Sequence, residues 1–145
     1  MRTKTNTLVS LLVALLLITG CSGPTARQQA GAGGANVRFD APAAQKVVDV
    51  AKTVPGVKDA AAVVMDRDIL AAVRVTGFHR LRLKPIKADV GNRVQARYPG
   101  FRVEVTADKK LFVQLQTLAG QVNTGAFAPA QVEQGVKKIE KEMTE

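Results

Sequence analysis

Side chains that could perform chemistry are few in this chain. The sequence holds one cysteine, one histidine, one tyrosine and no tryptophan, and no serine follows Ser22. A Ser-His-Asp or Cys-His nucleophilic site cannot be assembled from these residues. Zinc sites usually have several His or Cys ligands, so His79, alone between Phe78 and Arg80, is better explained as an exposed loop histidine. We therefore expect no catalytic residue, no metal site, no cofactor and no enzymatic activity.

Other chemical patterns have plainer explanations. Asp66 and Asp68 have a spacing that could contribute to a calcium loop, but residues 69–75 supply no further oxygen side chain, so a turn explains the pair. The glycines at 31, 33 and 34 have no strand before them and no suitably placed helix after them, which argues against a phosphate-binding loop. An enzyme that uses carboxylates is a third hypothesis, although no carboxylate pair falls in a pocket-forming context.

The cysteine has a specific position. Cys21 ends the stretch "ITGC", which follows a charged start (Arg2 and Lys4) and an apolar run at 8–18 that is too short to span a bilayer comfortably. This arrangement resembles a bacterial secretory signal with a lipobox, in which the thiol receives a diacylglyceryl group and the chain is cut just before the cysteine. We expect residues 1–20 to be a signal peptide that is removed and Cys21 to be the lipidation site. The alternative is an uncleaved apolar anchor.

Lipidation would decide both the attachment and the remaining chemistry of the chain. Two or more acyl chains on one residue hold a protein stably at a membrane, whereas one chain holds it only marginally. With Cys21 lipidated, no thiol is left for disulfides, redox cycling or metal ligation. We expect 21–39 to contain the lipidated cysteine and a flexible spacer rich in Gly, Ala and Gln, and 40–145 to form a single lipoprotein domain with a C-terminal helical tail.

The charge of the chain favours anionic partners. Its formal net charge is +9, or +7 once Arg2 and Lys4 leave with the signal peptide. For an exported lipoprotein, such partners are phospholipid head groups or acidic wall polymers, and nucleic acid is not expected.

The densest run of positive charge, the basic segment 79–87, contains no acidic residue. In an extended segment, positions 80, 82 and 84 would lie on one side. The segment is then either a contact for an anionic surface or a solvated strand edge or loop. The candidate contact residues are Arg80, Arg82, Lys84 and Lys87.

Apolar spacing predicts the first half of the domain. Asp40 can cap a helix that has Pro42 at its second position and continues to about Val54. Apolar runs at 57–65 and 69–76 are separated by a short turn, which predicts a β-hairpin.

The second half is expected to add one strand and three helices. Pro85 opens a helix, a strand follows at 101–106, Thr106 caps the next helix, and Pro129 begins the last one. In the strand, Phe101, Val103 and Val105 should face one side. The predicted fold is α+β in the order αββαβαα, a small three-stranded sheet with helices against one face.

Several stretches of this domain resemble one family. The helix at 44–54, the stretch "VPGVKDAAAVVMDRDILAAVRV" and the later "VGNRVQARYPGFRVEVTADKKLFVQL" resemble sporulation lipoproteins of the YhcN/YlaJ type, over about 40–145. The family's Tyr-Val-Ser stands here as Val103-Glu104-Val105, and its Asn-Gly as Asn123-Thr124-Gly125. These motifs are packing and turn patterns, so no site residue is carried over.

The resemblance implies a function for the chain. Members are membrane-anchored proteins of spore-forming bacteria, associated with the forespore or spore and with germination or outgrowth. For this chain it implies a lipid-anchored protein on the extracytoplasmic face of the cell membrane or of the inner spore membrane, with spore-envelope proteins as partners.

A second resemblance gives the basic segment a role. Helix, "PGV", hairpin, helix and a further strand are also similar to the BON domain, a small module of exported bacterial proteins thought to bind phospholipid surfaces. The alternative function is therefore a BON-like module that binds anionic phospholipid or wall polymer through Arg80, Arg82, Lys84 and Lys87.

Overall fold

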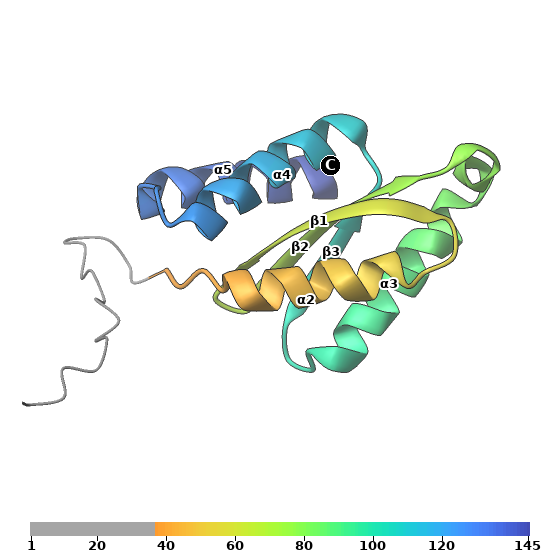
Figure 1. Ribbon diagram of the computed structural model, residues 1–145, viewed down its shortest axis with the longest axis horizontal. Helices are drawn as coiled ribbons and strands as arrows, with labels where there is room; N and C mark the ends of the chain where they lie inside the picture. Colours follow the sequence, from red (N-terminus) through yellow and green to blue (C-terminus); the bar gives the residue numbers. More distant parts are fainter. Residues whose placement is uncertain (1–36) are drawn as a thin grey trace, which may run out of the picture. The chain divides into compact units, whose positions relative to one another are not determined.

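The computed structural model describes residues 37–145, so the predicted signal peptide, Cys21 and most of the predicted spacer lie outside the described residues. The elements occur in the predicted order αββαβαα, with a short 3-10 helix (η1) before the second helix (Figure 1). They are α2 (Ala41–Lys52), β1 (Val57–Met65), β2 (Asp68–Val75), η1 (Gly77–Arg82), α3 (Leu83–Arg97), β3 (Arg102–Thr106), α4 (Lys109–Thr124) and α5 (Pro129–Thr144).

The three strands form one mixed sheet in the order β1-β2-β3. β1 and β2 are antiparallel and make the predicted hairpin, whose last pair is Met65 with Asp68. Asp66 in the turn has a positive φ of 54°, a conformation that Asp tolerates better than most residues. β3 is parallel to β2, which requires a crossover, and η1 and α3 provide it. Because β3 is last in the strand order, it is an edge strand, and α3 packs beside it.

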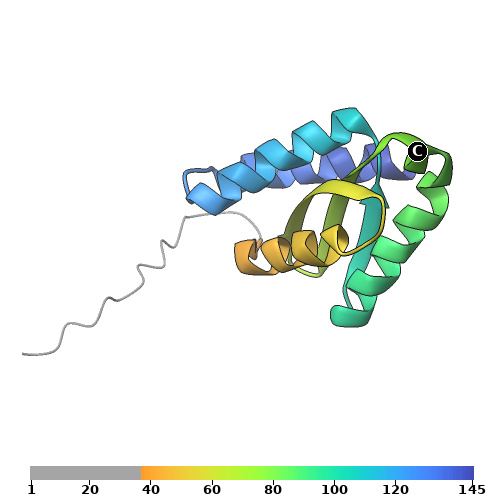
Figure 2. The same ribbon diagram turned by 45° about the vertical axis from the view of Figure 1, so that its right-hand side comes forward.

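Helices cover both faces of the sheet, so the prediction of helices against one face is wrong. α2 and α3 lie on one face and α4 and α5 on the other (Figures 1 and 2). The reason lies in the hairpin, where β1 and β2 are apolar and buried at consecutive positions, 60–65 and 69–73. Since neighbouring residues of a strand point to opposite faces, such runs must be buried on both sides.

Each face has its own hydrophobic core. On the α2–α3 face, alternate residues of the hairpin pack with Val47, Val90 and Val94, and Val103 and Val105 of β3 pack against them. On the α4–α5 face, the intervening residues pack with Phe112 and Leu115. The predicted facing of Phe101, Val103 and Val105 to one side is confirmed, and that side is the α2–α3 core.

Two helix caps show how local chemistry sets the boundaries. Asp40 caps α2 as predicted, because its Oδ1 accepts a hydrogen bond from the backbone N–H of Ala43 at 2.8 Å. The predicted cap of the next helix, Thr106, is wrong. Asp108 caps α4, since its carboxylate accepts from the N–H groups of Lys110 and Leu111, while Thr106 is the buried last residue of β3.

The first described residues already pack against the fold. Phe39 forms a bridge with Met65, and its ring meets that of Phe127 edge-on at 5.5 Å between centroids. Val37 also packs against the α4–α5 core. All described residues belong to one compact unit. The chain just before α2 thus contributes apolar side chains to the sheet's second face.

Candidate anionic-surface site

The basic segment, 79–87, is helical. It takes in most of η1 and the start of α3, so the extended conformation that would place Arg80, Arg82 and Lys84 on one side is wrong. Pro85 lies in the first turn of α3, where its fixed φ suits a helix. A 3-10 helix has about three residues per turn, so residues two apart point in different directions. The four cations are therefore distributed over η1 and the first turns of α3 instead of forming a row.

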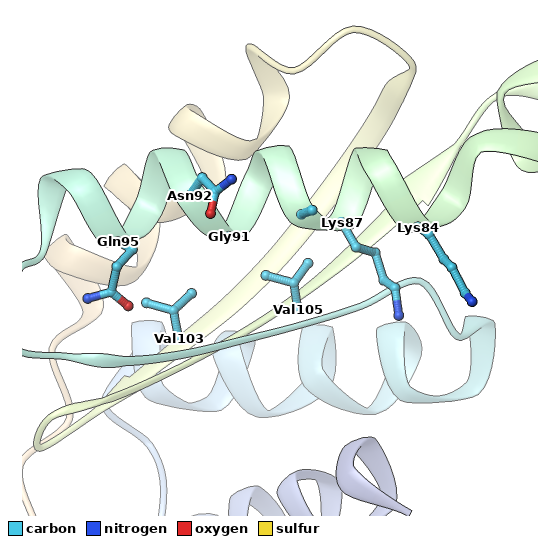
Figure 3. A pocket seen from close by; sticks show the side chains of 8 residues that line it. Lys84, Lys87, Gly91, Asn92, Gln95, Val103 and Val105 are labelled. Carbon is cyan, nitrogen blue, oxygen red and sulfur yellow. The ribbon is translucent and has the colours of Figure 1, made fainter.

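The predicted contact residues line three separate recesses. Lys84 and Lys87 line a groove of about 440 Å³ between α3 and β3 (Figure 3). Arg82 borders a recess of about 350 Å³ together with His79. Arg80 borders the largest, about 610 Å³, between the open end of the hairpin and the start of α4. Any surface that contacts all four must therefore cover the whole junction.

The groove between α3 and β3 has an apolar floor and a basic end. Val103 and Val105 of β3 lie between the strand and α3, and Lys84 and Lys87 lie toward the first turns of the helix (Figure 3). Gln95, near the other end, donates from Nε2 to the carbonyl oxygens of Tyr98 and Phe101 and so holds the loop after α3. The groove offers positive charge and amide groups to a ligand.

The four cations have no ionic partner among the described residues. Arg80, Arg82 and Lys84 are exposed and Lys87 is half-buried, and none of the four lies within 4.0 Å of a described carboxylate. His79 is exposed as predicted, but it lies in the 3-10 helix η1 and not in a loop. This end of the domain therefore presents positive charge that no described carboxylate neutralises by direct contact.

Sequence reasoning missed three further cations at this end. Lys58, Arg74 and Lys109 border the same recess as Arg80, together with the apolar side chain of Val113. Lys58 and Arg74 come from the paired ends of the hairpin, so the hairpin register could have placed them together. Lys109 comes from the start of α4, and only the tertiary fold brings it here.

Arg74 is held by two contacts and is therefore less free than Arg80. Its guanidinium donates to Asp59 at 2.8 Å and lies 4.8 Å from the centre of the Phe112 ring. Partial burial acts to raise the pKa of Asp59, but hydrogen bonds from Arg74, the Ala60 N–H and Lys52 outweigh it and lower that pKa. Asp59 therefore stays ionised and neutralises part of the positive charge that Arg74 brings to the recess.

The described residues contain no group of three or more His, Cys, Asp or Glu side chains that could hold a metal ion. Among the helices of 37–145, none is both long enough and apolar enough to cross a bilayer.

Comparison with known proteins identifies the family. Residues 20–144 match the sporulation lipoprotein family YhcN/YlaJ, and the chain belongs to this family. It is therefore a sporulation lipoprotein, a class held at a membrane by its lipid. No curated protein and no solved structure matches the chain. The matched range contains Cys21, which lies outside the described residues, and all four predicted contact residues.

Proposed function

We propose that this chain is a non-enzymatic protein anchored through lipid on Cys21 to the extracytoplasmic face of a membrane, the forespore or inner spore membrane in a sporulating cell. Its role there would be in germination or outgrowth, with spore-envelope proteins as partners. The observation that carries the proposal is the family match over 20–144, which includes the lipobox cysteine. The scarcity of nucleophilic and metal-ligating side chains supports the non-enzymatic part.

Intact mass tests the anchor. The protein extracted from membranes should begin at Cys21 and carry acyl groups, and the Cys21→Ser variant should remain as the uncut precursor. An unmodified thiol, or a mature chain that starts at another residue, would contradict the lipidation.

Fractionation tests the location and the role. The chain should sediment with the inner membrane of dormant spores, and spores that lack it should germinate or grow out more slowly. Normal germination and outgrowth, with the chain found only in vegetative membranes, would contradict this part of the proposal.

A second function, binding of an anionic surface, is favoured by one observation. Arg80, Arg82, Lys84 and Lys87 reach solvent without a described carboxylate partner. Near an anionic membrane each such cation contributes on the order of 1 kcal/mol, and an anchored domain already lies within reach of the bilayer. The surface would be phospholipid or an acidic wall polymer, as the BON-like alternative also implies.

Vesicle binding by the lipid-free chain from Ser22 onward tests this second function. We expect binding to acidic vesicles that weakens with salt, little binding to neutral vesicles, and loss of binding when the four cations are changed to Gln. The matched control changes Lys46, Arg67, Arg97 and Lys138 to Gln, which removes the same charge elsewhere and should reduce binding much less. Equal losses in both variants would mean that only the overall charge matters. A parallel sedimentation with purified wall polymer distinguishes the two surfaces.

A further inference from the structure

Two large apolar side chains stand almost fully in solvent on η1. Phe78 is 95% exposed and Leu81 is 92% exposed, and both exceed every other large hydrophobic residue that the structure describes. They are three residues apart in a 3-10 helix, where side chains at i and i+3 lie one above the other. They therefore form one apolar knob, the η1 knob, on the outer side of η1.

The fold holds this knob away from the cores. Figure 1 shows η1 at the open end of the hairpin, beyond the helices that cover the sheet. The backbone N–H of Thr76 donates to the Gly56 carbonyl oxygen at 3.1 Å, and that of His79 donates to the Thr76 carbonyl oxygen at 2.9 Å. Gly56 lies so close that an added Cβ would meet the His79 ring at 2.8 Å. η1 is thus fixed against the start of β1 while Phe78 and Leu81 face outward.

The charged side chains of the segment that carries the knob are all positive, and the nearest acidic residue along the chain after it, Asp89, borders the recess of Arg82 and pairs with Arg93. No acidic residue occurs from 69 to 88, and Arg80 and Arg82 alternate with the apolar residues of the knob. Lys84 and Lys87 follow in the first turns of α3. An apolar knob flanked by cations matches the interface of an anionic bilayer, where apolar groups enter below the head groups while guanidinium and ammonium groups stay among the phosphates.

We propose that Phe78 and Leu81 insert into an anionic phospholipid leaflet and that Arg80, Arg82, Lys84 and Lys87 bind the phosphates around them. The inference rests on the proposed function, because the lipid anchor holds the domain beside a bilayer, and it adds apolar insertion to the contact made by charge. The domain would then have two attachments to one membrane and a fixed orientation, with the junction of η1 and α3 against the lipid.

Tryptophan quenching tests the insertion directly, because the chain contains no tryptophan of its own. Full-length protein carrying Phe78→Trp is reconstituted into vesicles of phosphatidylcholine and phosphatidylglycerol that include lipid brominated along the acyl chain. We expect the indole emission to shift to shorter wavelength and to be quenched. Quenching should be weaker in pure phosphatidylcholine.

The matched control is Gln134→Trp, at an exposed position of α5. Its indole should keep the emission of an aqueous environment in both kinds of vesicle, although the protein is equally attached. Adding Leu81→Ser to Phe78→Trp should reduce the quenching, whereas adding Gln134→Ser should not. Because positions 78, 81 and 134 are all exposed, unchanged circular dichroism is expected for every variant and is checked first.

The outcomes separate this inference from the proposed function. If the Phe78→Trp indole is quenched no more than the Gln134→Trp indole, insertion is wrong, while the anchor and the charge contact are judged by their own experiments. Equal quenching in neutral and acidic vesicles would overturn the role of the cations. Quenching that needs acidic lipid and Leu81 supports the proposal even if the protein proves to have no role in germination.

Discussion

On the α4–α5 side of the sheet most basic side chains have acidic partners, whereas at the junction of η1 and α3 the four cations of the basic segment have none among the described residues. Lys110 pairs with Glu142 at 2.9 Å, Lys137 with Glu133 at 2.6 Å, and Arg102 with both Asp68 and Glu140. The hydrogen bond from Lys110 lowers the pKa of Glu142. The same residue types therefore neutralise charge within the fold in one region and remain available to a partner in the other.

The apolar residues differ between the two regions in the same way. Phe112 of α4 is 1% exposed in the second core, and Phe78 of η1 is 95% exposed. Contiguous exposed apolar side chains, such as Phe78 and Leu81 on η1, are typical of surfaces that bind a partner, whereas singly scattered ones are not. The α4–α5 side thus stabilises the domain through buried apolar side chains and ion pairs, and the junction of η1 and α3 is the surface for which we propose binding.

The largest expected effect is the difference in the free energy of unfolding between variants that truncate one phenylalanine in each region. Phe112→Ala removes a buried ring from the second core and should lower the free energy of unfolding by about 3–5 kcal/mol. Phe78→Ala removes a ring that contacts mainly solvent and should change it by less than about 0.5 kcal/mol. Urea unfolding of the two variants measures both values. A comparable loss in both would mean that the η1 knob belongs to the core.

The next largest effect on stability is expected from replacing two helical glycines with alanine. Gly91→Ala on α3 should stabilise the domain by about 0.5–1 kcal/mol, since alanine restricts the unfolded chain and its Cβ would meet Val105 Cγ2 at an ordinary 3.7 Å. Gly135→Ala on α5 should gain less, because its Cβ would lie 3.0 Å from Leu118 Cδ2. Thermal unfolding ranks them, and a larger gain at Gly135 would show that the α4–α5 core is packed more loosely than the structure indicates.

A smaller difference in melting temperature is expected between variants of two arginines. Arg102→Gln removes contacts to Asp68 and Glu140 and leaves these carboxylates less neutralised, so the melting temperature should fall slightly. Arg82→Gln breaks no ion pair with a described residue and should leave the melting temperature unchanged while weakening binding to acidic vesicles. If Arg82→Gln destabilised the domain as much as Arg102→Gln, the cations of the junction would also be structural.

Features of the fold that depend on residues close together in the sequence could be predicted, whereas those that depend on tertiary contacts could not. The hairpin, the Asp40 cap and the start of α5 at Pro129 follow from local spacing and turn chemistry, and all were predicted. The covering of the second face was not predicted, although Leu70 and Ala72, which point to that face, are as apolar as Ile69, Ala71 and Val73. A fully apolar run at 60–65 carried the same information.

The candidate site was predicted in composition but not in shape. Charge density alone identified Arg80 and Lys84, whereas the helical conformation that separates them results from the junction of η1 with α3. Lys109 reaches the recess beside Arg80 only because α4 returns past the hairpin, and no pattern near residue 80 indicates this. The exposure of Phe78 and Leu81 was likewise not predictable, since the sequence alone does not show which apolar side chains the tertiary fold leaves in solvent.

The smallest expected effect concerns the acidic residues that face α5. Partial burial first, and then the nearby charge of Glu140, raise the pKa of Glu104. A carboxyl whose pKa is higher in the folded than in the unfolded state favours folding in its protonated form, so this contribution is present at low pH and is lost as the pH rises through the two pKa values. Glu104→Gln should therefore raise the melting temperature slightly at pH 7, and the gain should vanish below about pH 4, where the unfolded glutamate is itself protonated. Glu145→Gln, at the exposed end of the chain, is the control and should show no such pattern. A Glu104→Gln variant that is less stable at pH 7 would mean that Arg102 neutralises this carboxylate more fully than the neighbouring acids repel it.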